Sequence, residues 1–86
     1  MANIASQMKR NRQNERARQR NKAVRTNLKT HLRVFRQAAE AGNADAAGEA
    51  FKAAARRLDK AASSGVVHEN YAANHKSRMA RQLQSL

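Results

Sequence analysis

Hydrophobic side chains recur every three or four residues along most of the chain, which is the period of an amphipathic α-helix. Three sets follow this period: Val24, Leu28, Leu32, Phe35 and Ala39; then Ala47, Ala50, Phe51, Ala54 and Leu58; and finally Val67, Tyr71, Met79 and Leu83. The runs of Val, Ile, Tyr and Phe that mark strands do not occur. The pattern therefore predicts an all-α fold of three helices, each of which buries one face.

Two glycine-centred breaks separate the predicted helices. Residues 41–43 (Ala-Gly-Asn) and 63–65 (Ser-Ser-Gly) each place a glycine where a helix ends in the left-handed conformation. Asn43 is predicted to cap the second helix, and Val67 or His68 to open the third. Because the connections are short, the three helices most simply pack as an antiparallel bundle.

The first helix is predicted to be much longer than the other two. It runs from about Ser6 to Ala41, or about 54 Å at 1.5 Å per residue, whereas the other helices have about 20 residues each. Its apolar face begins near Val24, and residues 9–22 contain only one apolar side chain, Ala17. We therefore expect a single domain over residues 1–86, a three-helix bundle with a long N-terminal helix that protrudes from it.

Composition adds a strong bias towards anionic partners. The 86 residues, which suffice for one small domain, include 18 Lys and Arg against 6 Asp and Glu, for a net charge of +12. Residues 1–36 contain eleven of the bases and one acid, Glu15, so like charges oppose helix formation there in water. Twelve of the bases are Arg, whose planar fork fits phosphate oxygens. The protruding helix is thus predicted to be basic and to bind a nucleic acid.

Other kinds of chemistry have little support. No cysteine is present, which excludes disulfides and thiolate metal sites, and His31, His68 and His75 are too scattered for a metal site. No nucleophile with a neighbouring base and no glycine-rich phosphate loop occurs, so neither an enzyme nor a cofactor is predicted. No apolar stretch reaches the roughly 18 to 20 residues of a membrane span. A soluble, cytoplasmic protein is expected.

The bases of the first helix form two rows on a helical wheel drawn at about 100° per residue. The first basic row consists of Lys9, Arg12, Arg16 and Arg20, and the second basic row consists of Arg18, Lys22, Arg25, Lys29, Arg33 and Arg36. The rows lie roughly 150° to 180° apart around the helix axis. A single basic face suits one phosphate backbone, whereas two nearly opposed rows suit a rod lodged between two nucleic-acid strands or helices.

Three other interpretations remain open from the residues alone. A run of bases is often a solvated helix face without a partner. An architectural DNA-binding protein uses the same chemistry on phosphates, and composition does not separate it from an RNA-binding protein. A cationic membrane-surface helix is the third, although residues 9–22 lack the apolar face that such a helix inserts into lipid.

Two long segments of the chain are distinctive. The first is the opening Met-Ala-Asn-Ile with the run KRNRQNERARQRNKAVRT at residues 9–26 and the Leu-Lys-Thr that soon follows; the second is GVVHENYAANHKSRM at residues 65–79. Together these segments resemble the bacterial small-subunit ribosomal protein S20 family. The resemblance covers essentially the whole chain and implies a three-helix bundle with an extended first helix. It also implies a protein of the small ribosomal subunit that binds 16S ribosomal RNA directly, at the 5′ domain and the penultimate helix near the 3′ end, beside other small-subunit components and without a membrane.

The resemblance also indicates which side chains face RNA. By position it implies Lys9, Arg10, Arg12, Arg16, Arg18, Arg20, Asn21, Lys22, Arg25 and Lys29 in the first helix, and His75, Lys76, Ser77 and Arg78 in the third. The second basic row adds Arg33 and Arg36, and Arg81 is the remaining base of the third helix. Tyr71 and Asn74 stand where the family more often has a base, so no RNA contact is predicted for them.

Overall fold

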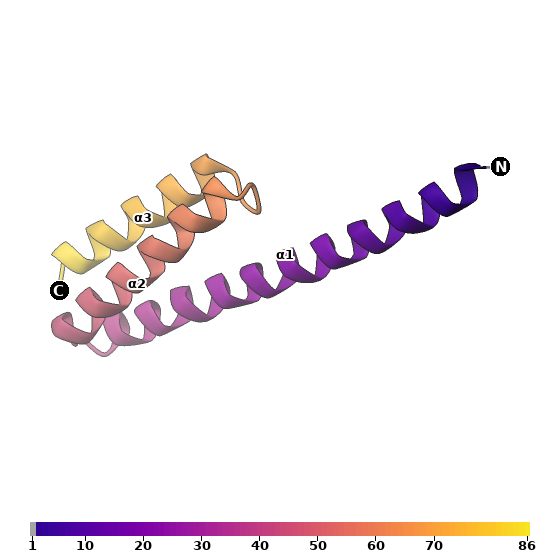
Figure 1. The fold of residues 1–86 in the computed structure, drawn as a ribbon. Helices are drawn as coiled ribbons and strands as arrows, with labels where there is room; N and C mark the ends of the chain where they lie inside the picture. Colours follow the sequence, from indigo (N-terminus) through magenta and orange to yellow (C-terminus); the bar gives the residue numbers. More distant parts are fainter. Residues whose placement is uncertain (1) are drawn as a thin grey trace.

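The computed structural model describes residues 2–86, which form three α-helices joined by two short connections (Figure 1). Helix α1 spans Ala2–Glu40, α2 spans Ala44–Ser63 and α3 spans Glu69–Gln84, and no strand occurs in these residues. Helix α2 runs back along the C-terminal half of α1, and α3 runs back along α2, so successive helices are antiparallel. The predicted all-α fold with three helices is confirmed.

Each connection contains a glycine in the left-handed backbone conformation as its second residue. The φ angles are +71° at Gly42 and +80° at Gly65. The N–H of Gly42 donates to the Ala39 carbonyl at 3.0 Å, and the N–H of Asn43 donates to the Ala38 carbonyl at 3.1 Å. The end of α2 makes the equivalent pair of bonds. This is the Schellman arrangement, which satisfies carbonyl groups that a helix end otherwise leaves without partners.

Side chains cap the N-termini of α2 and α3. Oδ1 of Asn43 accepts a hydrogen bond from the N–H of Ala46 at 3.1 Å, and Nδ1 of His68 accepts one from the N–H of Asn70 at 3.0 Å. Each bond satisfies one of the free N–H groups in the first helical turn. The cap at Asn43 agrees with the prediction, and His68, the alternative to Val67, opens α3.

The core is small and rich in alanine. Its buried residues are Leu28, Phe35, Ala39, Ala47, Ala54, Leu58, Ala61, Ala72 and Met79. Because five of these nine are alanine, the larger side chains of Leu28, Phe35, Leu58 and Met79 supply most of the buried apolar area. The core therefore depends on few side chains.

Helix α2 holds the bundle together because it packs against both other helices, whereas α1 and α3 meet only marginally. Phe35 of α1 and Phe51 of α2 lie with their ring centroids 6.3 Å apart and their planes tilted by 56°. This separation and tilt fall within the range that aromatic pairs favour. Across the other interface, Ala72 and Met79 of α3 complete the buried cluster around Leu58.

The N-terminal half of α1 projects beyond the bundle, as predicted (Figure 1). Residues 4–23 are exposed except for the half-buried Ala17 and Asn21, and the buried face of α1 begins with Val24 and Leu28. The molecule consequently measures 63 × 20 × 13 Å. The projecting part is a helix without a tertiary core of its own.

Three details differ from the sequence-based prediction. Helix α1 begins at Ala2 and not near Ser6, because the alanines before Ser6 favour helix and no glycine or proline interrupts them. Helix α3 has 16 residues and not about 20, since it begins after the cap at His68 and ends at Gln84. Tyr71 is not a core residue: it is 38% exposed, and Ala72 takes the core-facing position at 3% exposure. Adjacent helical positions differ by about 100°, so only one of the two can face α2.

Candidate nucleic-acid interface

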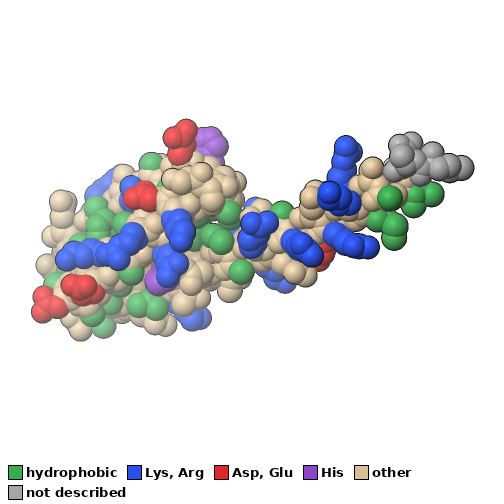
Figure 2. Space-filling model, in the orientation of Figure 1, with side chains coloured by type: hydrophobic (Ala, Val, Ile, Leu, Met, Phe, Trp, Pro, Cys, Tyr) green, Lys and Arg blue, Asp and Glu red, His purple; other side chains and the backbone are tan. Residues whose placement is uncertain are grey.

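Both basic rows of α1 are open to solvent. Every side chain of the first and second basic rows is exposed, from Lys9 to Arg36. Figure 2 shows Lys and Arg side chains along the projecting part of α1, away from the bundle. Because none of residues 4–23 is buried, their bases can reach anions on opposite sides of the helix. The projecting residues 4–23 of α1 form a rod that can touch two polyanionic surfaces at once.

Acidic side chains neutralise little of this surface. Nη2 of Arg18 donates to Oε2 of Glu15 at 2.8 Å, and Nε2 of Gln19 donates to Oε1 of Glu15 at 3.5 Å. An exposed pair of this kind contributes at most about 1 kcal/mol. In the described part of the chain, the ion pairs leave all the other bases of the two rows unpaired. The charge of the rod remains available for phosphate groups.

The two further candidates on α1, Arg10 and Asn21, lie between the rows. On the helical wheel they share the side of α1 that faces the core further along, at Leu28 and Phe35. Arg10 is exposed, whereas Asn21 is half-buried near the point where α1 leaves the bundle. Within residues 4–23 this side of α1 therefore contains the half-buried Ala17, polar side chains and a single base.

The five candidates on α3 do not form one surface. Lys76 is half-buried, and its Nζ donates to Oδ1 of Asp59 on α2 at 2.7 Å. His75 is also half-buried, and its ring centroid lies 4.3 Å from that of Tyr71. Ser77, Arg78 and Arg81 are exposed. Helix α3 therefore presents these three side chains to a partner, while Lys76 is engaged within the protein.

The structure adds two bases that sequence reasoning misses. Arg57 and Lys60 lie at the C-terminal end of α2 and line the same groove as Arg20 and Asn21 of α1. The sequence conceals them because residues 37–65 contain equal numbers of bases and acids and so look neutral as a segment. The spacing of three between Arg57 and Lys60, directly beside the buried Ala61, is the signal that could place them at the edge of the core.

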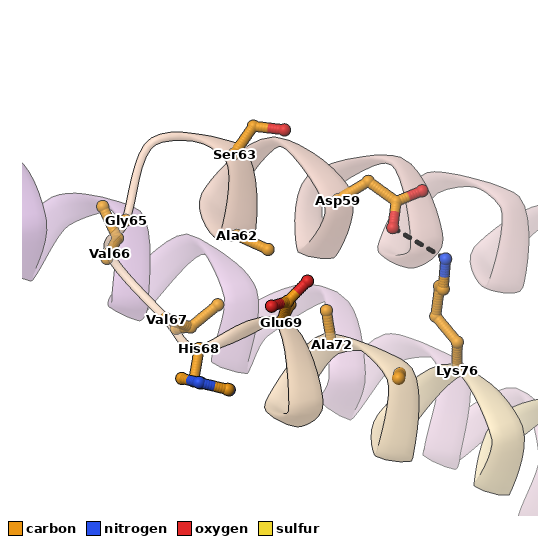
Figure 3. Close-up of a pocket in the computed structure, with 11 residues that line it drawn as sticks. Asp59, Ala62, Ser63, Gly65, Val66, Val67, His68, Glu69, Ala72 and Lys76 are labelled. Carbon is orange, nitrogen blue, oxygen red and sulfur yellow. Dashed lines mark hydrogen bonds and ion pairs between the residues drawn. The ribbon is translucent and has the colours of Figure 1, made fainter.

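A second groove, of about 930 Å³, lies on the α2–α3 side of the bundle (Figure 3). It is lined by the end of α2, the connection to α3 and the start of α3. Its charged side chains include Asp59 and Glu69 as well as Lys76, and the ion pair between Asp59 and Lys76 crosses from one helix to the other. Because two acidic side chains line this groove against one basic side chain, it does not extend the basic surface.

Comparison with known proteins agrees with the geometry. Residues 2–84 match the model of a single family, described as ribosomal protein S20. The chain belongs to this family. Two similar proteins, both named small ribosomal subunit protein bS20, come from Thermobifida fusca and Nocardioides sp.. They are 62% and 60% identical over 86 residues, which is 100% of this chain and 94% and 100% of the respective relatives. A bS20 protein from Mycobacterium tuberculosis is 58% identical over the full length of both chains.

Membership of the S20 family confirms the resemblance drawn from residues 9–26 and 65–79. It also confirms that the chain is a ribosomal protein and not an enzyme. Within residues 2–86 no group of three or more His, Asp and Glu side chains could hold a metal ion. In the same residues no helix is both long enough and apolar enough to cross a membrane.

Proposed function

We propose that this chain is a component of the small ribosomal subunit that binds 16S ribosomal RNA directly and braces two RNA elements with α1. The observation that carries the proposal is the long α1, whose N-terminal half projects beyond the bundle and whose two basic rows are exposed and lie roughly 150° to 180° apart. A rod of this kind neutralises phosphates on both sides at once. The S20 relatives are named for the small subunit, which makes the cytoplasmic ribosome the expected site of action.

The family resemblance suggests which RNA elements the rod touches. One is the 5′ domain of 16S RNA, and the other is the long penultimate helix near its 3′ end. The exposed Ser77, Arg78 and Arg81 of α3 provide further polar and basic contacts. RNA is favoured over duplex DNA because a helix in a major groove reads the groove with one face, whereas both faces of this helix are charged. Other small-subunit components are expected to lie beside the bundle.

Charge removal from one row at a time tests the brace. One variant replaces Lys9, Arg12, Arg16 and Arg20 with Gln, and a second replaces Arg18, Lys22, Arg25 and Lys29 with Gln. Gln retains the helix propensity of Lys and Arg. The first variant therefore empties the first basic row, and the second removes four of the six bases of the second basic row, without breaking α1. Chemical probing of 16S RNA in assembled subunits should then show one region of lost protection for each variant, with the other region still protected.

A control variant removes two exposed charges elsewhere. Lys52→Gln with Arg56→Gln changes the outer face of α2, and this variant should leave both protected regions in place. If the two row variants erased the same protections to the same degree, the rows would form one continuous electrostatic surface and the brace would be wrong. If the unaltered protein protected no part of 16S RNA, direct RNA binding itself would be wrong.

A further inference from the structure

A groove of about 530 Å³ lies where α1 leaves the bundle, between α1, the C-terminal end of α2 and the connection to α3. Its floor is apolar and contains Val24, Leu28, Ala61 and Val66. Leu28 and Ala61 belong to the buried core, while Val24 and Val66 are half-buried. Figure 2 shows hydrophobic side chains in the angle between the bundle and the projecting helix, beside Lys and Arg side chains.

The rim of this groove is basic and polar. It carries the side chains of Arg20 from α1 and of Arg57 and Lys60 from α2, together with the amides of Asn21 and Asn27. No acidic residue lines the groove. All three bases are exposed, and the ion pairs found in residues 2–86 use other bases. Positive charge is thus concentrated at the edge of an apolar hollow, opposite in sign to the acidic groove beside α3.

We propose that this groove binds a single unstacked nucleotide of RNA, with its base on the apolar floor and its phosphate against Arg20, Arg57 and Lys60. The inference rests on the proposed function, since it specifies one site within the RNA interface. A phosphate backbone alone does not explain the apolar floor, because phosphate oxygens gain nothing from contact with Val and Leu side chains. A base flipped out of its helix offers an apolar face, a hydrogen-bonding edge and an attached phosphate.

The groove has the size and chemistry that such a ligand needs. Its volume lies within the range of about 300 to 1,000 Å³ that small-molecule sites occupy, and its mixture of an apolar floor with few polar groups is typical of them. The amides of Asn21 and Asn27 can donate to and accept from a base edge. Paired bases in a regular helix are stacked, and their edges lie in the grooves, so the nucleotide must leave its helix to enter.

Two variants test the site, one by changing the apolar part of the groove and the other by removing charge from its rim. Ala17→Leu adds apolar bulk beside the groove at the half-buried Ala17 and leaves every charge in place. Arg57→Gln with Lys60→Gln removes two rim charges and leaves the floor intact. The control is Ala46→Leu, the same change at an exposed position in the first turn of α2. Circular dichroism should show that the two groove variants and the control have the same helix content as the unaltered protein.

The readout is base-specific chemical probing of 16S RNA, with reagents that together modify the Watson–Crick edges of all four bases. The unaltered protein should protect at least one base that becomes reactive again with both groove variants and stays protected with Ala46→Leu. The affinity of each groove variant for 16S RNA should fall roughly tenfold. Cleavage of the backbone by hydroxyl radicals should still show the protections made by the two basic rows.

Two results would overturn the site while leaving direct RNA binding intact. If both groove variants gave the base protections of the unaltered protein, the groove would hold no nucleotide, and an acidic segment of a neighbouring protein would become its expected occupant. If they weakened every protection equally, the groove would contribute general attraction and not a local site. Absence of any binding by the unaltered protein would instead contradict the proposed function.

Discussion

Gly42 and Gly48 lie close together in the sequence, but Gly42 has a left-handed backbone conformation and Gly48 has a helical one. Gly42 has a φ angle of +71° and forms the Schellman turn after α1, whereas Gly48 lies within α2. A Cβ atom built at either position would meet no atom within 4 Å, so side-chain crowding affects neither site. The two positions therefore separate the effect of backbone conformation from that of packing.

The same substitution at these glycines should change stability in opposite directions. Gly42→Ala should lower the free energy of unfolding by about 1 to 2 kcal/mol, because a side chain disfavours the left-handed conformation. Gly48→Ala should raise it by about 1 kcal/mol, because alanine is the better helix former. Urea denaturation followed by circular dichroism measures both values. Two changes of the same sign would contradict this account of the two backbones.

Single residues also show how far sequence reasoning reaches. The caps at Asn43 and His68 follow from local chemistry, since a cap bonds only to the turn that follows it. Tyr71 is predicted in the core because its side chain is large and continues the spacing of four from Val67, whereas on a helical wheel Ala72 lies on the side of Met79 and is the buried residue. Arg57 and Lys60 gain significance only when folding brings them beside Arg20, a proximity across helices that no local pattern encodes.

At the scale of the element, α1 consists of two parts with different support. Its C-terminal part is held by the core through Leu28, Phe35 and Ala39. Its N-terminal part has only the hydrogen bonds of the helix itself, and residues 1–36 contain eleven bases against one acid. The C-terminal end of α1 is predictable because Gly42 is the first helix breaker in the chain. Its start is not, because the segment before Val24 has no apolar period to mark it.

Hydrogen exchange on the free protein should divide α1 at this boundary. Amides before about residue 22 should exchange quickly, since a helix without tertiary packing opens readily and like charges destabilise it further. Amides of α2 at Ala54 and Leu58 should be the most protected, because α2 packs against both other helices. Binding to 16S RNA should slow exchange in the early part of α1. Equal protection along the whole of α1 in the free protein would show that the rod is stable alone.

At the scale of the molecule, shape and charge are arranged together. The radius of gyration is 17.5 Å, whereas a compact domain of this length would have about 12 Å. The extra extent comes from the projecting half of α1, which is also where the bases outnumber the acids most. The bundle anchors one end of the rod, and its own core does not depend on those bases. Removal of charge from the rod should therefore affect binding more than folding.

The dependence of RNA binding on salt provides the quantitative test of this arrangement. If about 6 to 10 bases contact phosphates, affinity for 16S RNA should fall by roughly 10³ to 10⁵ between 50 and 200 mM salt, because bound counterions are released on association. The variant that lacks the charges of Lys9, Arg12, Arg16 and Arg20 should show a shallower slope, by up to about one unit for each phosphate that no longer has a basic partner. Gly48→Ala, which leaves all charges in place, should keep the original slope.

Filter binding over a salt series measures the unaltered protein and both variants. An affinity nearly independent of salt would exclude phosphate neutralisation as the main source of binding. A row variant that kept the full slope would show that its four bases, although exposed along one side of the rod, do not face RNA.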